Sequence, residues 1–558
     1  MLKKFTSVLL LLLSYAPVFT QQPLAKEAWV GTGTIQTRIN SAGPLISAFR
    51  VPNATGTNMK TAVREVSLWI GGVGPSGDLH LAIQHPDSTK SDFRGGFRKV
   101  PNSAGVWKVT KAEIEQHLLD FQDNGIVDHP ISSIYAWPGR KNPFAVQYNG
   151  FAMDSLTDWL GAPFANLQWA DQTYNPDQGD VPSFGQIGYY PDRQPDEMVY
   201  VPFHVKPGPS FFPTTKSFQV DCSALFYTYY CDDASFLDDA VYAYITLQSY
   251  ATDRLDTAFV ALKLDVDINN PKDDYMGCSP WGDLYFYDSD TTIFNAGKYS
   301  PVIGFNMING VLDTFGRGAG VHNILPLHPL DSGLPYAILE PELGVEYYRY
   351  MTGSWKDGTP VTFGGSGYGG TELSKYVFTG TPGRPGEWSE LEVGSKPGNR
   401  QALVSSGPTT FLSLGQNRML FSLFRVSGET SLSNQLKTVK KNVVDQYLFY
   451  YGDFFPPEIN PYDTLHCFLT SSTTHAAEPD LRMFPNPVNT ELHVTASQQV
   501  IRDLLLFDIC GRLAYTQAEP EESNHAILRL GALSSGMYIL QGELTDGTRF
   551  TKRLLIQH

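Results

Sequence analysis

Short apolar runs separated by glycine and proline dominate the chain from Trp29 to about Val201. In one of them, Val66 to Ile70 is followed directly by two glycines. Runs of this length bounded by turn residues are typical of strands joined by hairpins. Strand-like runs return after a group of prolines and glycines near residue 208 and cover 224–230, 240–247 and 259–266.

Two segments have helical periodicity instead. Thr110 and Glu113 form a capping box, apolar residues then recur along one face, and Gly125 supplies a stop. A second helix is expected from Ser433 to Tyr451. Its apolar stripe, which we expect to pack in the core, comprises Leu436, Val439, Val443 and Tyr447.

The pattern predicts an all-β protein with a multi-domain β-sandwich body and only a few helices. The 29 Tyr, 33 Phe, 50 Gly and 38 Pro residues fit many short strands joined by turns. We expect an N-terminal β-rich domain at 21–208 and a second at 209–457. A polar linker at 458–480 should then lead to a small C-terminal domain at 481–558.

The first 20 residues have the features of a secretory signal peptide. Lys3 and Lys4 precede an apolar stretch centred on Val8 to Leu13, which is too short to span a bilayer. The formal net charge of −16 becomes more negative when the two lysines are removed. This charge argues against nucleic acid or anionic lipid as partners and favours divalent cations.

The five cysteines are odd in number and show no CxxC spacing, so neither a zinc ribbon nor a dense disulfide framework is indicated. Two interpretations remain open. Cys222 and Cys231 could pair, or most cysteines could be buried thiols in a chain large enough to need no crosslinks.

The last 80 or so residues have the most specific pattern in the chain. Proline and asparagine set a turn before an alternating strand, and Asp and Gly then form a tight hairpin between two buried strands. The motif residues are Phe484, Pro485, Asn486, Pro487, Asp508, Gly511, Arg512, Gly536, Tyr538 and Lys552.

These spacings resemble the type A C-terminal sorting domain of Bacteroidetes proteins exported by the type IX, or Por, secretion system. The resemblance implies a small Ig-like sandwich of seven strands that the outer-membrane translocon recognises. It also implies that a sortase-like peptidase removes the domain, often joining the body to anionic lipopolysaccharide at the cell surface. The alternative is an ordinary Ig-like domain that binds a carbohydrate or a protein.

Blocks of the body also resemble segments that recur in large Bacteroidetes surface proteins with this tail. Examples are residues 68–72, 137–139, 273–278 and 355–360. The resemblance supports location and architecture, and it implies no particular chemistry.

Two acidic segments are candidate calcium sites. Behind the first helix, oxygen ligands and a glycine follow the spacing of an EF-hand loop, although Ile131 replaces the final acid. The ligands there would be Asp120, Gln122, Asn124 and Asp128; the alternative is a solvated turn that caps the helix.

In the second segment, side chains that alternate along a strand should point to one face. Its members are Asp265, Asp267, Asn269, Asp273 and Asp274. Carboxylates so close together repel one another unless a cation or solvent neutralises them. The alternative is a solvated strand end.

The usual enzyme motifs are absent from the sequence: there is neither an HExxH zinc motif nor a GxSxG nucleophile elbow. Tyr135, Trp137 and the group from Tyr347 to Tyr350 could stack on sugars, but aromatic residues in β proteins more often pack in the core. We therefore favour an adhesion, structural or ligand-binding module for a glycan or a protein. The alternative is a secreted glycosidase-like hydrolase that uses two carboxylates.

Overall fold

The computed structural model describes most of the body and most of the C-terminal segment. In the body these are residues 24–53, 58–153, 160–165, 173–184, 194–231, 234–270, 272–279, 282–289, 300–330, 332–429 and 431–451. In the C-terminal segment they are 481–485, 488–496, 500–508, 513–518, 524–533, 536–545 and 549–556. The expected signal peptide and linker lie outside the described residues.

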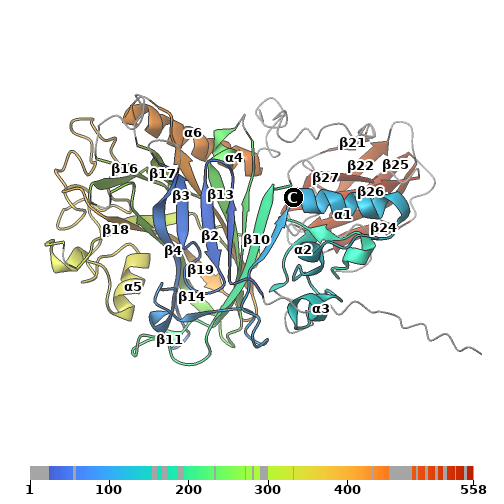
Figure 1. Ribbon diagram of the computed structural model, residues 1–558, viewed down its shortest axis with the longest axis horizontal. Coiled ribbons are helices and arrows are strands. Elements are labelled where there is room, and N and C mark those ends of the chain that lie inside the picture. The colour runs from blue at the N-terminus through green and yellow to red at the C-terminus, as the bar shows by residue number, and fades with distance from the viewer. Residues whose placement is uncertain are drawn as a thin grey trace, which may run out of the picture.

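Two large, mainly antiparallel sheets build the body (Figure 1). The first runs in the order β1-β2-β3-β4-β14-β19-β18, with β5 beside β4 and β11 beside β5. Its strands are β1 Glu27–Gly31, β2 Gln36–Asn40, β3 Ala48–Pro52, β4 Met59–Val73, β5 Leu79–Ile83, β11 Lys216–Ser217, β14 Leu255–Val266, β18 Val321–Leu327 and β19 Arg400–Phe411.

The second sheet runs in the order β15-β16-β17-β20-β13-β12-β10-β6, with β7 beside β10. Its strands are β6 Phe93–Gly95, β7 Trp107–Thr110, β10 Glu197–Val205, β12 Val220–Thr228, β13 Ala240–Ser249, β15 Asp274–Cys278, β16 Asp283–Asp288, β17 Val302–Leu312 and β20 Gln416–Val426. A separate two-stranded ribbon joins β8 Phe164–Ala165 to β9 Val181–Pro182.

Both sheets take strands from either side of residue 208. In the first, β4 pairs with β14, with Leu68 opposite Leu262. In the second, β10 pairs with β12, with Val199 opposite Phe226. One apolar core fills the space between the sheets and contains all four of these side chains. The division expected at 208 therefore does not separate two cores.

Alternating residues of the second sheet serve two cores, as the strand period of two requires. On β13, Val241 and Ala243 face the first sheet, whereas Ala240 and Tyr242 belong to a second apolar cluster on the outer face. The helices cover this outer face and one side of the first sheet. They are α1 Lys111–Asn124, α2 Ser132–Tyr135, α3 Ala145–Asn149, α4 Ser235–Asp238, α5 Gly344–Met351 and α6 Leu432–Tyr451. Single 3-10 turns lie at η1 Ser88–Lys90, η3 Pro176–Gln178 and η5 Tyr336–Ile338.

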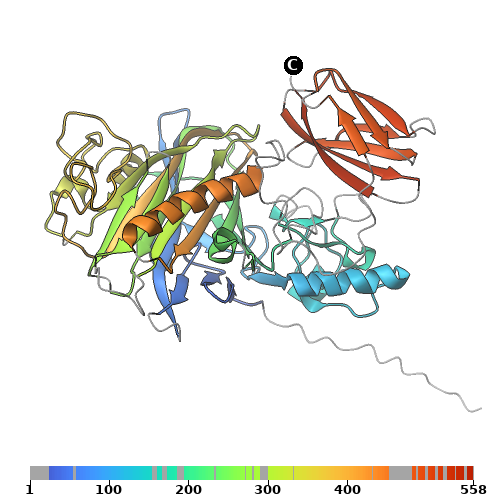
Figure 2. The same cartoon turned by 90° about the horizontal axis from the view of Figure 1, so that it is seen from above.

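Both predicted helices are confirmed. The capping box that starts α1 is formed, with the Thr110 amide donating to the Glu113 carboxylate at 2.8 Å. Gly125 ends the helix in the left-handed conformation, with φ 77°. The long helix α6 lies across the outer face of the second sheet (Figure 2).

The suggested pairing of Cys222 with Cys231 is wrong. Cys222 is a free buried thiol in the core between the sheets, whereas Cys231 belongs to the cluster on the opposite face of the second sheet. Cys231 is disulfide-bonded, so its partner is another cysteine. Cys278 is also a free buried thiol, in agreement with the alternative interpretation.

The C-terminal segment folds around a core of its own. A three-stranded sheet, β21-β22-β25, faces a four-stranded sheet, β24-β23-β26-β27, and side chains of both meet in this core. The strands are β21 Leu481–Phe484, β22 Glu491–Ala496, β23 Ile501–Asp508, β24 Leu513–Ala518, β25 His525–Arg529, β26 Gly536–Leu544 and β27 Arg549–Ile556. The expected small sandwich of seven strands is confirmed.

Candidate functional site

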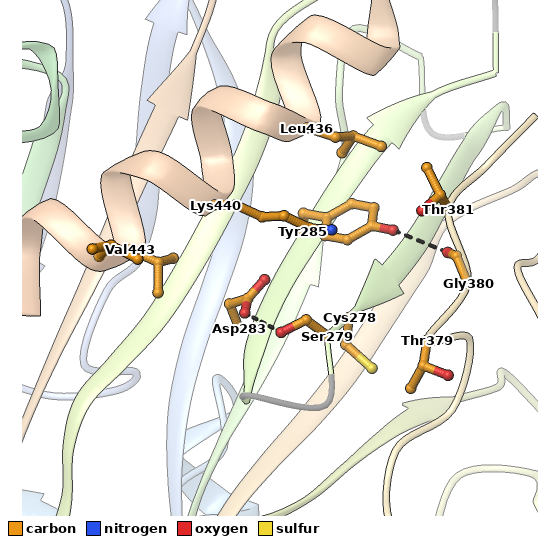
Figure 3. Close-up of a pocket in the computed structure, with 11 residues that line it drawn as sticks. Cys278, Ser279, Asp283, Tyr285, Thr379, Gly380, Thr381, Leu436, Lys440 and Val443 are labelled. Atoms are coloured by element: carbon orange, nitrogen blue, oxygen red, sulfur yellow. Dashed lines mark hydrogen bonds between the residues drawn. The ribbon is translucent and has the colours of Figure 1, made fainter.

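A pocket of about 280 Å³ opens where α6 passes over the end of the β15–β16 hairpin. Side chains from the hairpin rise toward α6, from which others point back (Figure 3). A third wall comes from the segment 379–381. The lining residues are Cys278, Ser279, Asp283, Tyr285, Thr379, Gly380, Thr381, Leu436, Lys440, Val443 and Val444.

The strand pairing explains how the floor of the pocket is shaped. Gly277 lies directly opposite Tyr285, and a Cβ at Gly277 would come within 2.4 Å of the Tyr285 hydroxyl. The missing side chain therefore gives the Tyr285 ring room to cross the neighbouring strand. The Tyr285 hydroxyl then donates to the Gly380 carbonyl at 3.4 Å, which joins the floor to the third wall.

Asp283 is the buried acid of the pocket. Its side chain is 4% exposed, and one carboxylate oxygen accepts a hydrogen bond from the Ser279 hydroxyl. The other oxygen, Oδ2, is buried without a hydrogen-bond partner in the described structure. Burial raises the pKa of Asp283, while Ser279 and the positive charge of Lys440 act in the opposite direction. A buried acceptor with an unused lone pair is costly unless a ligand supplies a donor.

The expected apolar stripe of α6 is only partly correct. Leu436 and Val439 are buried, but Tyr447 is 48% exposed, and Val443 lines the pocket. The face that α6 buries against the sheet is shifted around the helix and includes the amide side chain of Gln446. Buried amides hide this face from a hydrophobicity pattern. Neither the true core face nor the pocket beside it is visible in the apolar pattern of the sequence.

The Gln446 amide shows why a polar residue is tolerated on that face. Its Oε1 accepts hydrogen bonds from the Ser422 hydroxyl at 2.6 Å and from the Asn306 amide at 3.0 Å. Ser422 lies opposite Asn306 in the β17–β20 pair, so the two donors come from neighbouring strands. A buried polar group costs little free energy when it is hydrogen-bonded. The two hydrogen bonds from the strands to Gln446 therefore hold α6 on the sheet.

The first candidate calcium segment lies partly within a helix. Asp120, Gln122 and Asn124 lie within α1, where residues two positions apart point to different sides. Asp120 accepts hydrogen bonds from the His129 amide and ring, and Asn124 donates to Asp128 at 2.9 Å. Asp120 and Asn124 thus hydrogen-bond within the turn that follows the helix, and calcium at this segment stays a prediction.

The second candidate calcium segment is divided between two places. A register shift interrupts the β4–β14 pairing next to Asp265, and the strand ends one residue later. Asp265 bonds to Gln401 at 3.1 Å, whereas Asp267 pairs with Arg64. Asn269 donates to Ser300 at 3.1 Å. The expected common face along one strand is therefore wrong.

Part of this segment nevertheless gathers around Asp274. Asp288, which is not among the predicted ligands, lies directly across the β15–β16 pair from Asp274. Burial, reinforced by the charges of Asp288, Asp267 and Asp273, raises the pKa of Asp274 to about 8. The Asp274 carboxylate accepts from the Ile268 amide at 3.1 Å, and its Oδ1 is buried without a hydrogen-bond partner in the described structure.

This acidic group does not form a ready metal site. Within the described ranges, no three His, Cys, Asp or Glu side chains are placed to hold a metal ion together. A calcium ion would need the side chains around Asp274 to close in on it. Calcium therefore stays a prediction for this group.

The aromatic residues considered for sugar stacking are mostly core residues. Trp137 and Tyr350 are fully buried, and Tyr135 is 4% exposed. Tyr347 and Tyr348 are half-buried against the core between the sheets. The side chains that pack on the sheets are thus unavailable to an external ligand.

The C-terminal motif residues mark strand ends and strand pairings. Phe484 ends β21 and is 52% exposed. Gly536 begins β26, on which Tyr538 lies opposite Asp508 on one side and Leu554 on the other. Lys552 lies opposite Leu540. Pro485 follows β21 directly. The other four motif residues, Asn486, Pro487, Gly511 and Arg512, lie outside the described residues.

A family comparison decides what this segment is. Residues 482–557 match the family model described as "Secretion system C-terminal sorting domain". Residues 482–557 are a type IX sorting domain. The sorting domain implies export of the chain to the cell surface or the extracellular space, and interaction with the type IX machinery and its sortase-like peptidase. No helix in the described part of the chain is long and apolar enough to cross a membrane.

Comparisons of the whole chain add little to the sorting domain. A polysaccharide lyase aligns with 95% of this chain and 47% of its own length, at 7% identity and a TM-score of 0.23. Dimeric latent PorU from Porphyromonas gingivalis aligns with 64% of this chain and 31% of its own length, at 9% identity and a TM-score of 0.13. The chain spans less than half of either protein, and similarities this low carry no argument. No curated protein matches the chain.

Proposed function

We propose that the body carried by the sorting domain is a ligand-binding β-sandwich module that acts at the cell surface or outside the cell. The pocket beside α6 supports this proposal. A concave, mostly apolar site with a few convergent polar groups is the usual form of a small-molecule site, and Asp283 supplies a buried acceptor there. The body would act as an adhesion or binding component.

The pocket gives less support to the alternative, a glycosidase-like hydrolase. That chemistry needs two carboxyl groups roughly 5 to 10 Å apart across the scissile bond. Among the described residues that line the pocket, Asp283 is the single carboxylate. Cys278 also lines the pocket, but burial raises the pKa of its thiol well above the ordinary value, which disfavours the thiolate needed for nucleophilic attack.

Processing forms the second part of the proposal. The peptidase would cleave in the linker before Phe484 and join the body to anionic lipopolysaccharide.

Calcium near Asp274 forms the third part of the proposal. Titration of the full mature chain with calcium, followed by calorimetry, should release heat at millimolar calcium, and Asp274→Asn should abolish that heat.

The export step can be tested with two neighbouring residues of β25. Leu528 is fully buried in the core of the sorting domain, whereas Ile527, on the other face, is 40% exposed. A charge at Leu528 should unfold the domain, because burying an unpaired charge has a large free-energy cost. We expect Leu528→Asp to retain the protein in the periplasm, as deletion from residue 484 onward should, and Ile527→Asp to leave export intact.

Localisation in the native host, by fractionation and surface labelling, measures the result. Surface display of Leu528→Asp at the wild-type level would contradict the role of the folded sorting domain. Retention of both variants would show that the effect comes from the added charge rather than from unfolding.

A further inference from the structure

The pocket is lined by one acidic and one basic side chain, whose formal charges sum to zero. Asp283 lies on the strand floor and Lys440 on α6, and both line the same space (Figure 3). The described structure contains no ion pair between them, although the Lys440 charge is close enough to act on the pKa of Asp283. A simple cation would be repelled by Lys440, and a simple anion by Asp283. The pair therefore favours a ligand without net charge that can both donate and accept.

The remaining lining groups are of two kinds. Four hydroxyl side chains line the pocket: Ser279, Tyr285, Thr379 and Thr381. On the opposite side, α6 contributes the aliphatic side chains of Leu436, Val443 and Val444. A hydroxyl can both donate and accept a hydrogen bond, and aliphatic side chains need an apolar partner surface. A ligand that fits should thus have a polar edge and an apolar face.

The size of the pocket limits the ligand further. Sites for small molecules usually enclose about 300 to 1,000 Å³. At about 280 Å³, this pocket lies at the lower limit of that range. It has room for one ring and its substituents rather than for an extended chain.

We infer that the pocket binds a single neutral sugar residue, with its hydroxyl edge bridging Asp283 and Lys440 and its C–H face against α6. The inference rests on the proposed ligand-binding function and names its ligand class. One sugar hydroxyl donates to the unused Oδ2 of Asp283, and a neighbouring hydroxyl accepts from the Lys440 ammonium. This bridge satisfies the buried acceptor that the protein itself leaves without a partner.

The test uses the full mature chain and ligand-observed NMR with calorimetry. The probes are the methyl glycosides of glucose, galactose, mannose, fucose and N-acetylglucosamine, together with butylamine, leucine and butyrate. We expect at least one glycoside to bind, and none of the charged or zwitterionic probes to bind more tightly. Asp283→Asn and Lys440→Met should each weaken binding of that glycoside about tenfold or more.

Lys437→Met is the matched control, because Lys437 is exposed on the same helix and does not line the pocket. It should leave the affinity unchanged. Lys440→Met keeps the test valid if Asp283→Asn fails to fold, because Lys440 is exposed at the helix surface.

Each other outcome overturns a definite part of the reasoning. If butylamine, leucine or butyrate binds more tightly than every glycoside and the pocket variants abolish that binding, the sugar class is wrong while the pocket remains a ligand site. If no probe binds, or if glycoside binding is unaffected by both pocket variants, the sugar inference fails. Binding of no probe would also remove the support for the proposed function.

Discussion

The buried ion pair between Glu390 and Arg400 allows a quantitative test of how the third wall of the pocket is held. The Glu390 side chain is 1% exposed and the Arg400 side chain 10%. Arg400 Nε donates to both carboxylate oxygens, at 3.1 and 3.0 Å, and the Met276 amide of β15 donates to one of them at 2.6 Å. The pair therefore connects the segment after Trp388 to the strand that leads into the pocket.

The variant Arg400→Met removes the cation and leaves the carboxylate buried. Loss of one partner of a buried pair typically costs about 3 to 5 kcal/mol, because the remaining charge is uncompensated. We expect Arg400→Met to lower the free energy of unfolding by this amount at pH 7. In Glu390→Gln/Arg400→Met the neutral amide can still accept from Met276, so the loss should fall to about 1 kcal/mol, close to the value of one hydrogen bond.

The pH dependence follows from the same geometry. Burial raises the pKa of Glu390 in the folded state, and Arg400 opposes that rise. Without Arg400 the folded pKa rises further above the unfolded value of about 4.3. An acid with a raised folded pKa contributes its stability below the unfolded pKa and loses it as the pH rises through the folded pKa. The deficit of Arg400→Met should therefore be small near pH 4 and grow toward pH 7.

Tryptophan fluorescence during urea denaturation measures the body selectively, because all nine tryptophans precede residue 481 and the sorting domain has none. Arg384→Met is the matched control: Arg384 pairs with Glu387 at 3.4 Å but is 67% exposed, so its loss should cost less than about 1 kcal/mol. A loss below about 1 kcal/mol for Arg400→Met at pH 7, or a loss that does not change between pH 4 and 7, would show that Arg400 does not compensate a buried charge on Glu390.

Two further predictions concern the pocket floor and the acidic group. Gly277→Ala should displace the Tyr285 ring and lower the affinity for any pocket ligand about tenfold. Gly333→Ala, at an open turn, should affect only stability. Equal affinity of the Gly277→Ala and wild-type chains in calorimetry would contradict this expectation. The pKa of Asp274 is about 8 in the folded state and about 3.9 in the unfolded state. The proton on Asp274 therefore contributes its full stability below about pH 3.9, and this stability is lost as the pH rises toward 8. Asp274→Asn should remove this dependence, which amounts to at most about 1.4 kcal/mol per pH unit, and an unchanged pH profile of urea denaturation would show that Asp274 is not the titrating group.

Local patterns in the sequence predicted local structure well. The capping box of Thr110 and Glu113, the stop at Gly125 and the strand ending at Val266 all lie where their residue types indicated. The sorting domain was also predictable, because its turns and alternating strands follow one another within a short stretch. These features depend on residues a few positions apart, which the chain brings together without long loops.

Features that combine distant segments were not predictable in this way. The period of a strand shows which side chains share a face, but not which partner that face meets. Cys222 and Cys231 are close in sequence and lie on opposite faces of one sheet. Asp288 became part of the acidic group only because β16 pairs with β15. The amides on α6, such as Gln446, are stable in the core because two other strands supply their donors.

Patterns along the chain were enough to predict an all-β protein, the positions of its two main helices and the export signal in its last strands. Those patterns did not show that strands from both sides of residue 208 share two sheets, or that α6 lines a pocket with Asp283 and Lys440. Closing a longer loop adds little entropic cost, so many pairings of distant strands are nearly equal in loop entropy. The choice among them depends on the packing of whole faces, which no single segment of the sequence contains.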